Sequence, residues 1–186
     1  CVKMMILVTG GSGSGKSAFA EDCVVSCGET ERIYIATMYP FDEESRRRVQ
    51  RHQKMRQGKR FETVECYTGL HKVQVPENST VLLECMSNLV ANEMFQEDGA
   101  HENTVEVVIE GVRHLREQAG NLVIVTNEIF SEAASYQGET ELYQEYLGKI
   151  NQFLGTLADQ VVEVVYGIPV YHKKNASEEA GRMCVG

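Results

Sequence analysis

A glycine-rich stretch near the start of the chain carries the clearest chemical signal. Residues 10–17 read Gly-Gly-Ser-Gly-Ser-Gly-Lys-Ser, which fits the pattern G-x-x-x-x-G-K-S/T at every fixed position. Such glycines let backbone N–H groups surround phosphate oxygens, and the helix that follows adds partial positive charge. Lys16 is placed to reach the β- and γ-phosphates, and the Ser17 hydroxyl is placed to ligate Mg²⁺. We expect a nucleoside triphosphate site made by Gly10, Gly11, Ser12, Gly13, Ser14, Gly15, Lys16 and Ser17.

A basic segment further along the chain contains a histidine. Eight of the eighteen Lys and Arg residues lie between Arg46 and Arg60, although the whole chain has a net charge of −9. One interpretation is a solvated helix face in which His52 is incidental. The other is a second polyphosphate site with His52 as nucleophile, because nearby cations keep the imidazole neutral and would stabilise a departing pyrophosphate. The residues alone leave both interpretations open.

Acidic side chains stand where strands are expected to end, and open α/β sheets gather ligands at that edge. Glu84 closes an apolar run, where a carboxylate is costly unless it is paired. Mg²⁺, bound directly or through water, would pair it, whereas an ordinary strand-end acid would reach solvent. Glu65 and Glu128 are weaker candidates of the same kind.

Strands and helices that position these residues alternate along the chain. Apolar runs of strand type occupy residues 4–9, 33–37, 63–66, 80–85, 122–126 and 161–166. Segments of helical period occupy residues 17–27, 43–57, 87–95, 104–118 and 141–157, with Asp42 as a candidate N-cap. Residues 168–172 follow the last strand too closely for a crossover helix and predict an antiparallel edge strand. We expect an α/β, three-layer P-loop NTPase (RecA-like) sandwich whose sheet is mostly parallel.

Length and composition narrow the class of protein. The 186 residues predict one nucleotide-binding domain over residues 1–174 and a polar tail over residues 175–186. The net charge of −9 argues against nucleic acid as a partner. No apolar run approaches the ~18 residues of a membrane span and no secretory segment precedes the first strand, so we expect a cytoplasmic protein. The six cysteines form no C-x-x-C pair and are interpreted as free thiols.

Taken together, the loop, the histidine segment and several strand ends resemble one family. It is the bifunctional adenosylcobinamide kinase/adenosylcobinamide-phosphate guanylyltransferase family of cobalamin biosynthesis. The resemblance runs in order from residue 4 to about residue 173, and its histidine and late pieces are more specific than the loop. The matching pieces are residues 6–11, 14–17, 34–37, 48–52, 81–85, Ser87, Asn92, 123–128, Gly148, 151–152, 158–159 and 165–169.

The resemblance implies two successive reactions on a corrinoid substrate. The aminopropanol hydroxyl of adenosylcobinamide is phosphorylated with ATP or GTP, and the phosphate then receives GMP from GTP through a guanylyl-histidine, which gives adenosylcobinamide-GDP. It also implies a homotrimer. By motif position, His52 is the guanylylated residue and acts with Lys16, while Ser17 and Glu84 are our metal candidates. Nucleotide contacts beyond the loop are implied for Ala36, Thr37, Met38, Gln53, Lys54, Met55, Arg56, Glu65 and Glu84.

Two segments depart from the family pattern. Residues 129–135 read Ile-Phe-Ser-Glu-Ala-Ala-Ser where the family has Val-Gly-x-Gly-Ile-Val-Pro, and Gln144 stands where the family has an arginine. These changes leave open a small-molecule kinase that has lost guanylyl transfer. A third class, a nucleotide-switched binding module, has no need of the nucleophile that His52 would supply.

Overall fold

The structure is a computed structural model that describes residues 3–127 and 139–174. Within these ranges, seven strands form one sheet in the order β3-β2-β4-β5-β1-β6-β7. All neighbouring strands pair in parallel except β6 and β7, which form an antiparallel pair. The strands are β1 (Met4–Gly10), β2 (Arg32–Ala36), β3 (Phe61–Glu65), β4 (Thr80–Leu83), β5 (Asn121–Asn127), β6 (Gln160–Val165) and β7 (Ile168–Lys173).

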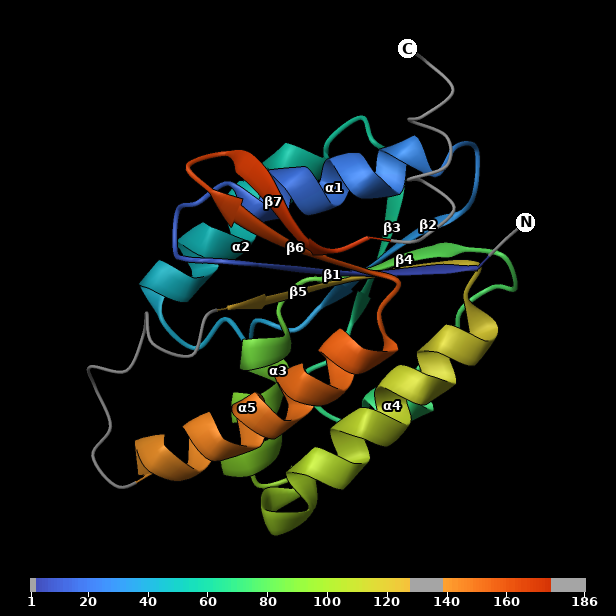
Figure 1. The fold of residues 1–186 in the computed structure, drawn as a ribbon. Coiled ribbons are helices and arrows are strands. Elements are labelled where there is room, and N and C mark those ends of the chain that lie inside the picture. Colours follow the sequence, from blue (N-terminus) through green and yellow to red (C-terminus); the bar gives the residue numbers. More distant parts are fainter. Residues whose placement is uncertain (1–2, 128–138, 175–186) are drawn as a thin grey trace.

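Helices cover both faces of this sheet (Figure 1). On one face lie α1 (Lys16–Ser26) and α2 (Glu43–Arg56), and on the other lie α3 (Met86–Phe95), α4 (Thr104–Gln118) and α5 (Glu139–Leu157). Two short 3₁₀ turns, Leu70–Lys72 and His101–Asn103, were not anticipated from the sequence pattern. The expected α/β sandwich with a mostly parallel sheet and one antiparallel edge strand is confirmed. No helix in the described ranges is long and apolar enough to cross a membrane.

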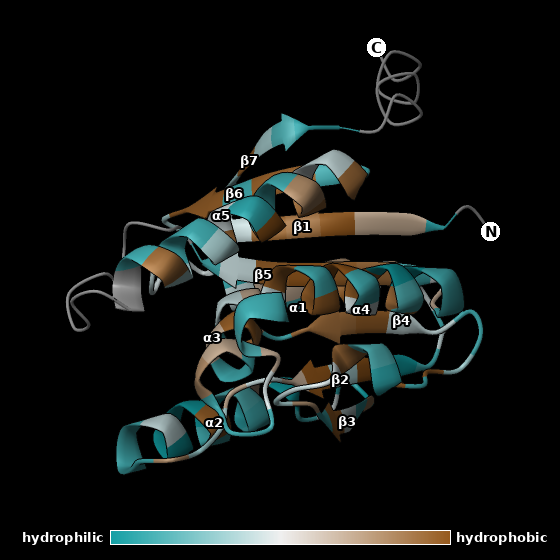
Figure 2. Ribbon diagram, turned by 90° about the horizontal axis from the view of Figure 1, so that it is seen from below, coloured by the Kyte–Doolittle hydropathy of each residue, from teal (hydrophilic) through white to brown (hydrophobic). Residues whose placement is uncertain are grey.

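The central strands divide the interior into two cores. In β1, Met5 and Leu7 belong to the core beneath α3, α4 and α5, whereas Ile6 and Val8 belong to the core beneath α1. This is the two-residue alternation of a strand buried on both faces. Figure 2 accordingly shows the central strands β1, β4 and β5 largely in the hydrophobic colour.

Helix α2 is mostly charged and is hydrophilic along most of its length (Figure 2). The helix begins where the Asp42 carboxylate accepts the backbone N–H of Ser45 at 2.7 Å, so the predicted N-cap is confirmed. Such a helix gains little from burial, and its position on the domain depends on a few specific contacts. Those contacts lie at its carboxyl-terminal half, where it meets the ends of β2 and β4.

Candidate active site

The phosphate loop joins β1 to α1 with a backbone that requires glycine. Gly10, Gly13 and Gly15 have φ values of 155°, 72° and 92°. A Cβ on Gly10 would lie 2.6 Å from Ser14 Oγ and 2.7 Å from the carbonyl oxygen of Val164. A side chain at this position would therefore force the loop away from β6.

The loop also leaves polar groups available to a ligand. No side chain caps the N-terminus of α1, so the N–H groups of its first turn have no side-chain acceptor. The buried Ser14 hydroxyl has no hydrogen-bond partner among the described residues. Lys16 Nζ donates to the carbonyl oxygen of Gly11 at 3.0 Å, which holds the ammonium over the loop. Phosphate oxygens would satisfy these donors and their positive charge.

A turn from the far end of the chain fastens this loop. Gly167, in the turn between β6 and β7, donates its N–H to the carbonyl oxygen of Ser14 at 2.7 Å. A Cβ on Gly15 would lie 3.4 Å from Gly167 Cα, so the two glycines allow the backbones to approach closely. The glycine of the hairpin therefore has a role in holding the phosphate loop.

His52 and Glu84 form the central polar pair of the site. His52, on α2, lies with Nδ1 2.9 Å from Oε1 of Glu84, which follows β4. The other carboxylate oxygen, Oε2, accepts the backbone N–H groups of Thr37 at 2.9 Å and Met38 at 3.2 Å. The Glu84 side chain is buried, and these partners account for both of its oxygens.

The charge state of Glu84 fixes the tautomer of the histidine. Burial by itself would raise the pKa of Glu84, but the hydrogen bonds from His52 and from the backbone of Thr37 outweigh it and leave the pKa below its ordinary value. An ionised carboxylate only accepts hydrogen bonds, so Nδ1 of His52 carries the hydrogen. The neutral imidazole then has its lone pair on Nε2, free to attack.

Tyr34 and Arg56 attach α2 to the sheet beside this pair. The Arg56 guanidinium lies 3.5 Å from the centre of the Tyr34 ring. The Tyr34 hydroxyl is 3.4 Å from Nδ1 of His52 and also hydrogen-bonds the Glu84 carboxylate. Burial and the negative charge of Glu84 raise the pKa of Tyr34, so the phenol stays protonated at neutral pH. The sequence did not predict the contact of Tyr34 with Arg56 or with the His52–Glu84 pair. Tyr34 is buried on the opposite face of β2 from Ile33 and Ile35.

His52 and Glu84 share one small cavity of about 10 Å³ with Ser17, the last residue of the phosphate loop. A volume of this size admits about one water molecule. The cavity brings together four residues predicted from the sequence, Ser17, His52, Met55 and Glu84, and it is completed by Glu21, Tyr34, Leu82 and Val125.

Glu21 is the second residue that the sequence analysis missed. The residue is only 4% exposed, and Lys59 Nζ lies 3.5 Å from Oε2, which has no hydrogen-bond partner among the described residues. Glu21 follows Ser17 by four residues on α1, so both side chains stand on the same helix face. That spacing was the available signal.

The remaining predicted residues separate into two groups. Ala36 ends β2, and Thr37 and Met38 directly after it donate their backbone N–H groups to Glu84. In contrast, Gln53 and Lys54 are exposed on α2, and Glu65 at the end of β3 lines a different, larger groove. Glu128 and the altered segment 129–135 lie outside the described residues.

Comparison with known proteins gives a consistent result over nearly the whole chain. The model of the cobinamide kinase/cobinamide phosphate guanyltransferase family matches residues 6–171. The bifunctional adenosylcobalamin biosynthesis protein CobU of Escherichia coli K12 is 32% identical over 184 residues, which are 90% of this chain and 98% of that protein. The protein of the same name from Salmonella typhimurium LT2 is 30% identical with the same coverage. Among solved structures, a Pyrococcus horikoshii OT3 protein aligns with a TM-score of 0.49 and 8% identity over 94% of this chain and 88% of its own.

Proposed function

Since the chain belongs to the cobinamide kinase/cobinamide phosphate guanyltransferase family, we propose that its phosphate loop and its His52–Glu84 pair serve the two half-reactions of that family. The protein is an enzyme of cobalamin biosynthesis that acts as cobinamide kinase and guanylyltransferase.

The kinase step is assigned to the phosphate loop. The uncapped N-terminus of α1 and the ammonium of Lys16 would hold the β- and γ-phosphates of ATP or GTP. The aminopropanol hydroxyl of adenosylcobinamide attacks the γ-phosphorus and loses its proton to water. A new P–O bond forms, the bond from the γ-phosphorus to the bridging oxygen breaks, and the nucleoside diphosphate leaves. Lys16 stabilises the charge that moves onto the leaving oxygen.

The transfer step is assigned to His52, and its hydrogen bond to Glu84 is the observation that carries this assignment. Nε2 attacks the α-phosphorus of GTP, a P–N bond forms and pyrophosphate leaves. The phosphate oxygen of adenosylcobinamide phosphate then attacks the same phosphorus, the P–N bond breaks and adenosylcobinamide-GDP is released. Glu84 keeps Nδ1 protonated throughout and stabilises the positive charge on the guanylylated ring.

The site also suits Mg²⁺. Proteins commonly hold Mg²⁺ through one or two oxygen ligands while substrate phosphates supply others. The Ser17 hydroxyl would bind it directly, and Glu84, whose oxygens are engaged by His52 and two backbone N–H groups, would act through water. When bound, the ion neutralises phosphate charge during both transfers.

The family resemblance extends the proposal to the assembly and its setting. We propose that the enzyme is a cytoplasmic homotrimer that takes adenosylcobinamide and its phosphate as substrates and binds no nucleic acid. The net charge of −9 supports the last point.

A decisive test is incubation with GTP labelled at its α-phosphate, followed by mass spectrometry of the protein. We expect a GMP adduct on His52 that passes to adenosylcobinamide phosphate, and we expect His52→Asn to abolish the adduct. The absence of an adduct in the wild type, with kinase turnover intact, would favour the kinase that has lost guanylyl transfer. The altered residues 129–135 and Gln144 are the features that favour a kinase without guanylyl transfer. Nucleotide hydrolysis with neither reaction would favour a nucleotide-switched module.

A further inference from the structure

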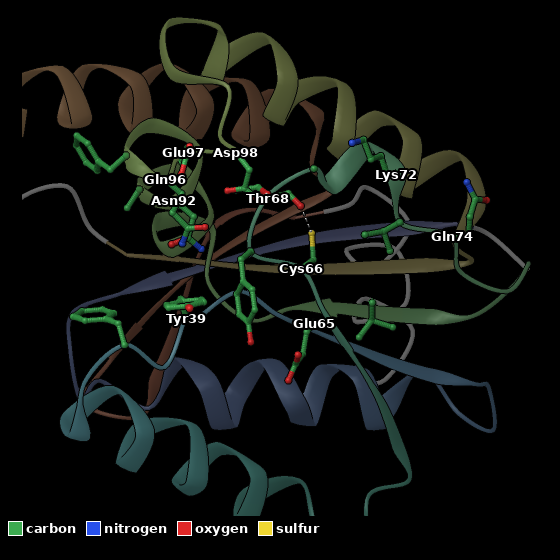
Figure 3. A pocket seen from close by; sticks show the side chains of 17 residues that line it. Tyr39, Glu65, Cys66, Thr68, Lys72, Gln74, Asn92, Gln96, Glu97 and Asp98 are labelled. Atoms are coloured by element: carbon green, nitrogen blue, oxygen red, sulfur yellow. Dashed lines mark hydrogen bonds between the residues drawn. The ribbon is translucent and has the colours of Figure 1, made fainter.

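A wide groove lies beside the site just described, and neither half-reaction as assigned above uses it. Its volume is about 1140 Å³, which exceeds the roughly 300–1,000 Å³ typical of small-molecule sites. Tyr39 precedes α2, Glu65 and Thr68 come from the end of β3 and the turn after it, and Asn92 and Gln96 come from the end of α3. Figure 3 shows these side chains around one open space.

Aromatic side chains are unusually exposed around this groove. Tyr39 is 48% exposed, Phe41 is 71% exposed and Phe95 is 50% exposed. The Tyr39 and Tyr67 rings pack edge to face with centroids 5.1 Å apart, so part of the wall is already ordered. Large apolar side chains left in water around a hollow are a signature of ligand binding.

The charged side chains of the groove argue against a polyphosphate. Three acids, Glu65, Glu97 and Asp98, line it against one base, Lys72. Tyr67 donates to the Glu65 carboxylate, and its pKa is raised by burial and by that negative charge. Amide side chains complete the lining. Such a surface favours a neutral or cationic ligand that carries amide groups.

The groove and the catalytic pair share a wall. The backbone N–H groups of Thr37 and Met38 donate to Glu84, and the next residue, Tyr39, lines the groove. From the groove side, Asn92 Nδ2 donates to the carbonyl oxygen of Thr37 at 2.8 Å. A ligand in the groove therefore lies one short segment away from the residues that hold His52.

We infer that this groove seats the corrin macrocycle of the substrate, an inference that rests on the function proposed above. A corrinoid is a broad, flat ring with peripheral carboxamides and a cationic cobalt centre. Its flat face suits the exposed aromatic rings, its carboxamides suit Asn92 and Gln96, and its charge suits the acidic rim. The flexible aminopropanol arm then extends past Tyr39 toward the transferring phosphate.

The test uses exposed groove residues from two elements. Phe41→Ala and Phe95→Ala remove stacking surface, and we expect each to raise the KM for adenosylcobinamide about tenfold. The KM for GTP and the yield of the GMP adduct, measured without corrinoid, should stay within about twofold. Tyr171→Ala, an exposed aromatic on β7 outside the groove, is the matched control and should change neither KM.

A charge reversal distinguishes a corrinoid from a nucleotide as the occupant of the groove. Glu97→Lys should raise the KM for adenosylcobinamide if the groove seats the corrinoid, and should lower the KM for GTP if the groove receives a nucleotide. An unchanged corrinoid KM in both phenylalanine variants, or an effect confined to GTP, would overturn the inference. A wild-type enzyme that forms the GMP adduct but has no corrinoid turnover would instead refute the proposed function itself.

Discussion

Replacement of Glu84 by glutamine tests the tautomer argument directly. Two backbone donors, the N–H groups of Thr37 and Met38, face Oε2 of Glu84, and Nδ1 of His52 faces Oε1. In the Glu84→Gln variant, the amide oxygen must face the two backbone donors, because turning the NH₂ group toward them would leave both unsatisfied. The NH₂ group then faces Nδ1 of His52, which has to become an acceptor. The ring hydrogen moves to Nε2, and the attacking lone pair is lost.

The two backbone N–H groups that face Glu84 determine how much the substitution should slow guanylylation. Restoring the reactive tautomer requires the amide to turn and orphan two buried N–H groups, at about 1–3 kcal/mol each. The total of about 2–6 kcal/mol corresponds to a loss of about 30-fold to about 10⁴-fold in the rate of guanylylation. Phosphorylation of adenosylcobinamide, which does not use the nucleophile, should fall much less.

Single-turnover formation of the GMP adduct, followed by mass spectrometry, measures this rate. Nitrogen NMR of the His52 ring provides an independent readout, since it should show the hydrogen on Nδ1 in the wild type and on Nε2 in Glu84→Gln. A variant that guanylylates within about threefold of the wild type, or that keeps the Nδ1 hydrogen, would refute the reasoning.

Three further predictions follow from the same geometry. Lys16→Ala should abolish both reactions because the ammonium over the loop is lost, and unchanged kinase turnover would contradict the role given to the loop. Gly10→Ala should weaken nucleotide binding by at least about tenfold, measured by titration calorimetry, because its Cβ would lie 2.7 Å from the carbonyl oxygen of Val164. The pKa of Glu84 lies below its ordinary value of 4.5, so its ionised form stabilises the fold above that pH and the contribution is lost as the pH falls through the lowered value. The difference in free energy of unfolding between wild type and Glu84→Gln, from urea denaturation, should therefore be constant above pH 4.5 and narrow as the pH falls below it. A difference that stays constant below pH 4.5 would count against this assignment.

Local patterns were enough to predict most of the fold. Apolar runs correctly predicted the strands, and helical spacing predicted the helices. The short gap before β7 predicted the antiparallel edge strand. The helical period was less informative about burial in α5, where Leu142 is 45% exposed while Leu147 and Leu154 are buried. Helical spacing alone could not tell how the first turn of α5 extends beyond its neighbours.

The sequence carried a strong local signal for the phosphate loop and a weaker one for His52, which only the family resemblance singled out. It carried none for the partner of Glu84. A metal ion was the expected partner because a histidine more than thirty residues away gives no local signal. Glu21 and the large groove were missed for the same reason. Glu21 meets Lys59, which follows α2, only in the folded chain, and the groove forms only where the end of β3 meets the end of α3.

The hydrogen bond from Gly167 to Ser14 joins the phosphate loop to a part of the chain that is made much later. The phosphate loop is synthesised long before the turn between β6 and β7 that fastens it. β6, which pairs with β1 beside this loop, is equally late. A nascent chain therefore exposes a complete Gly-Lys-Ser sequence long before the loop has its fastened shape. The fastened shape of the phosphate loop therefore depends on closure of a very long segment of chain, a slow, non-local step that has to wait for β6 and β7.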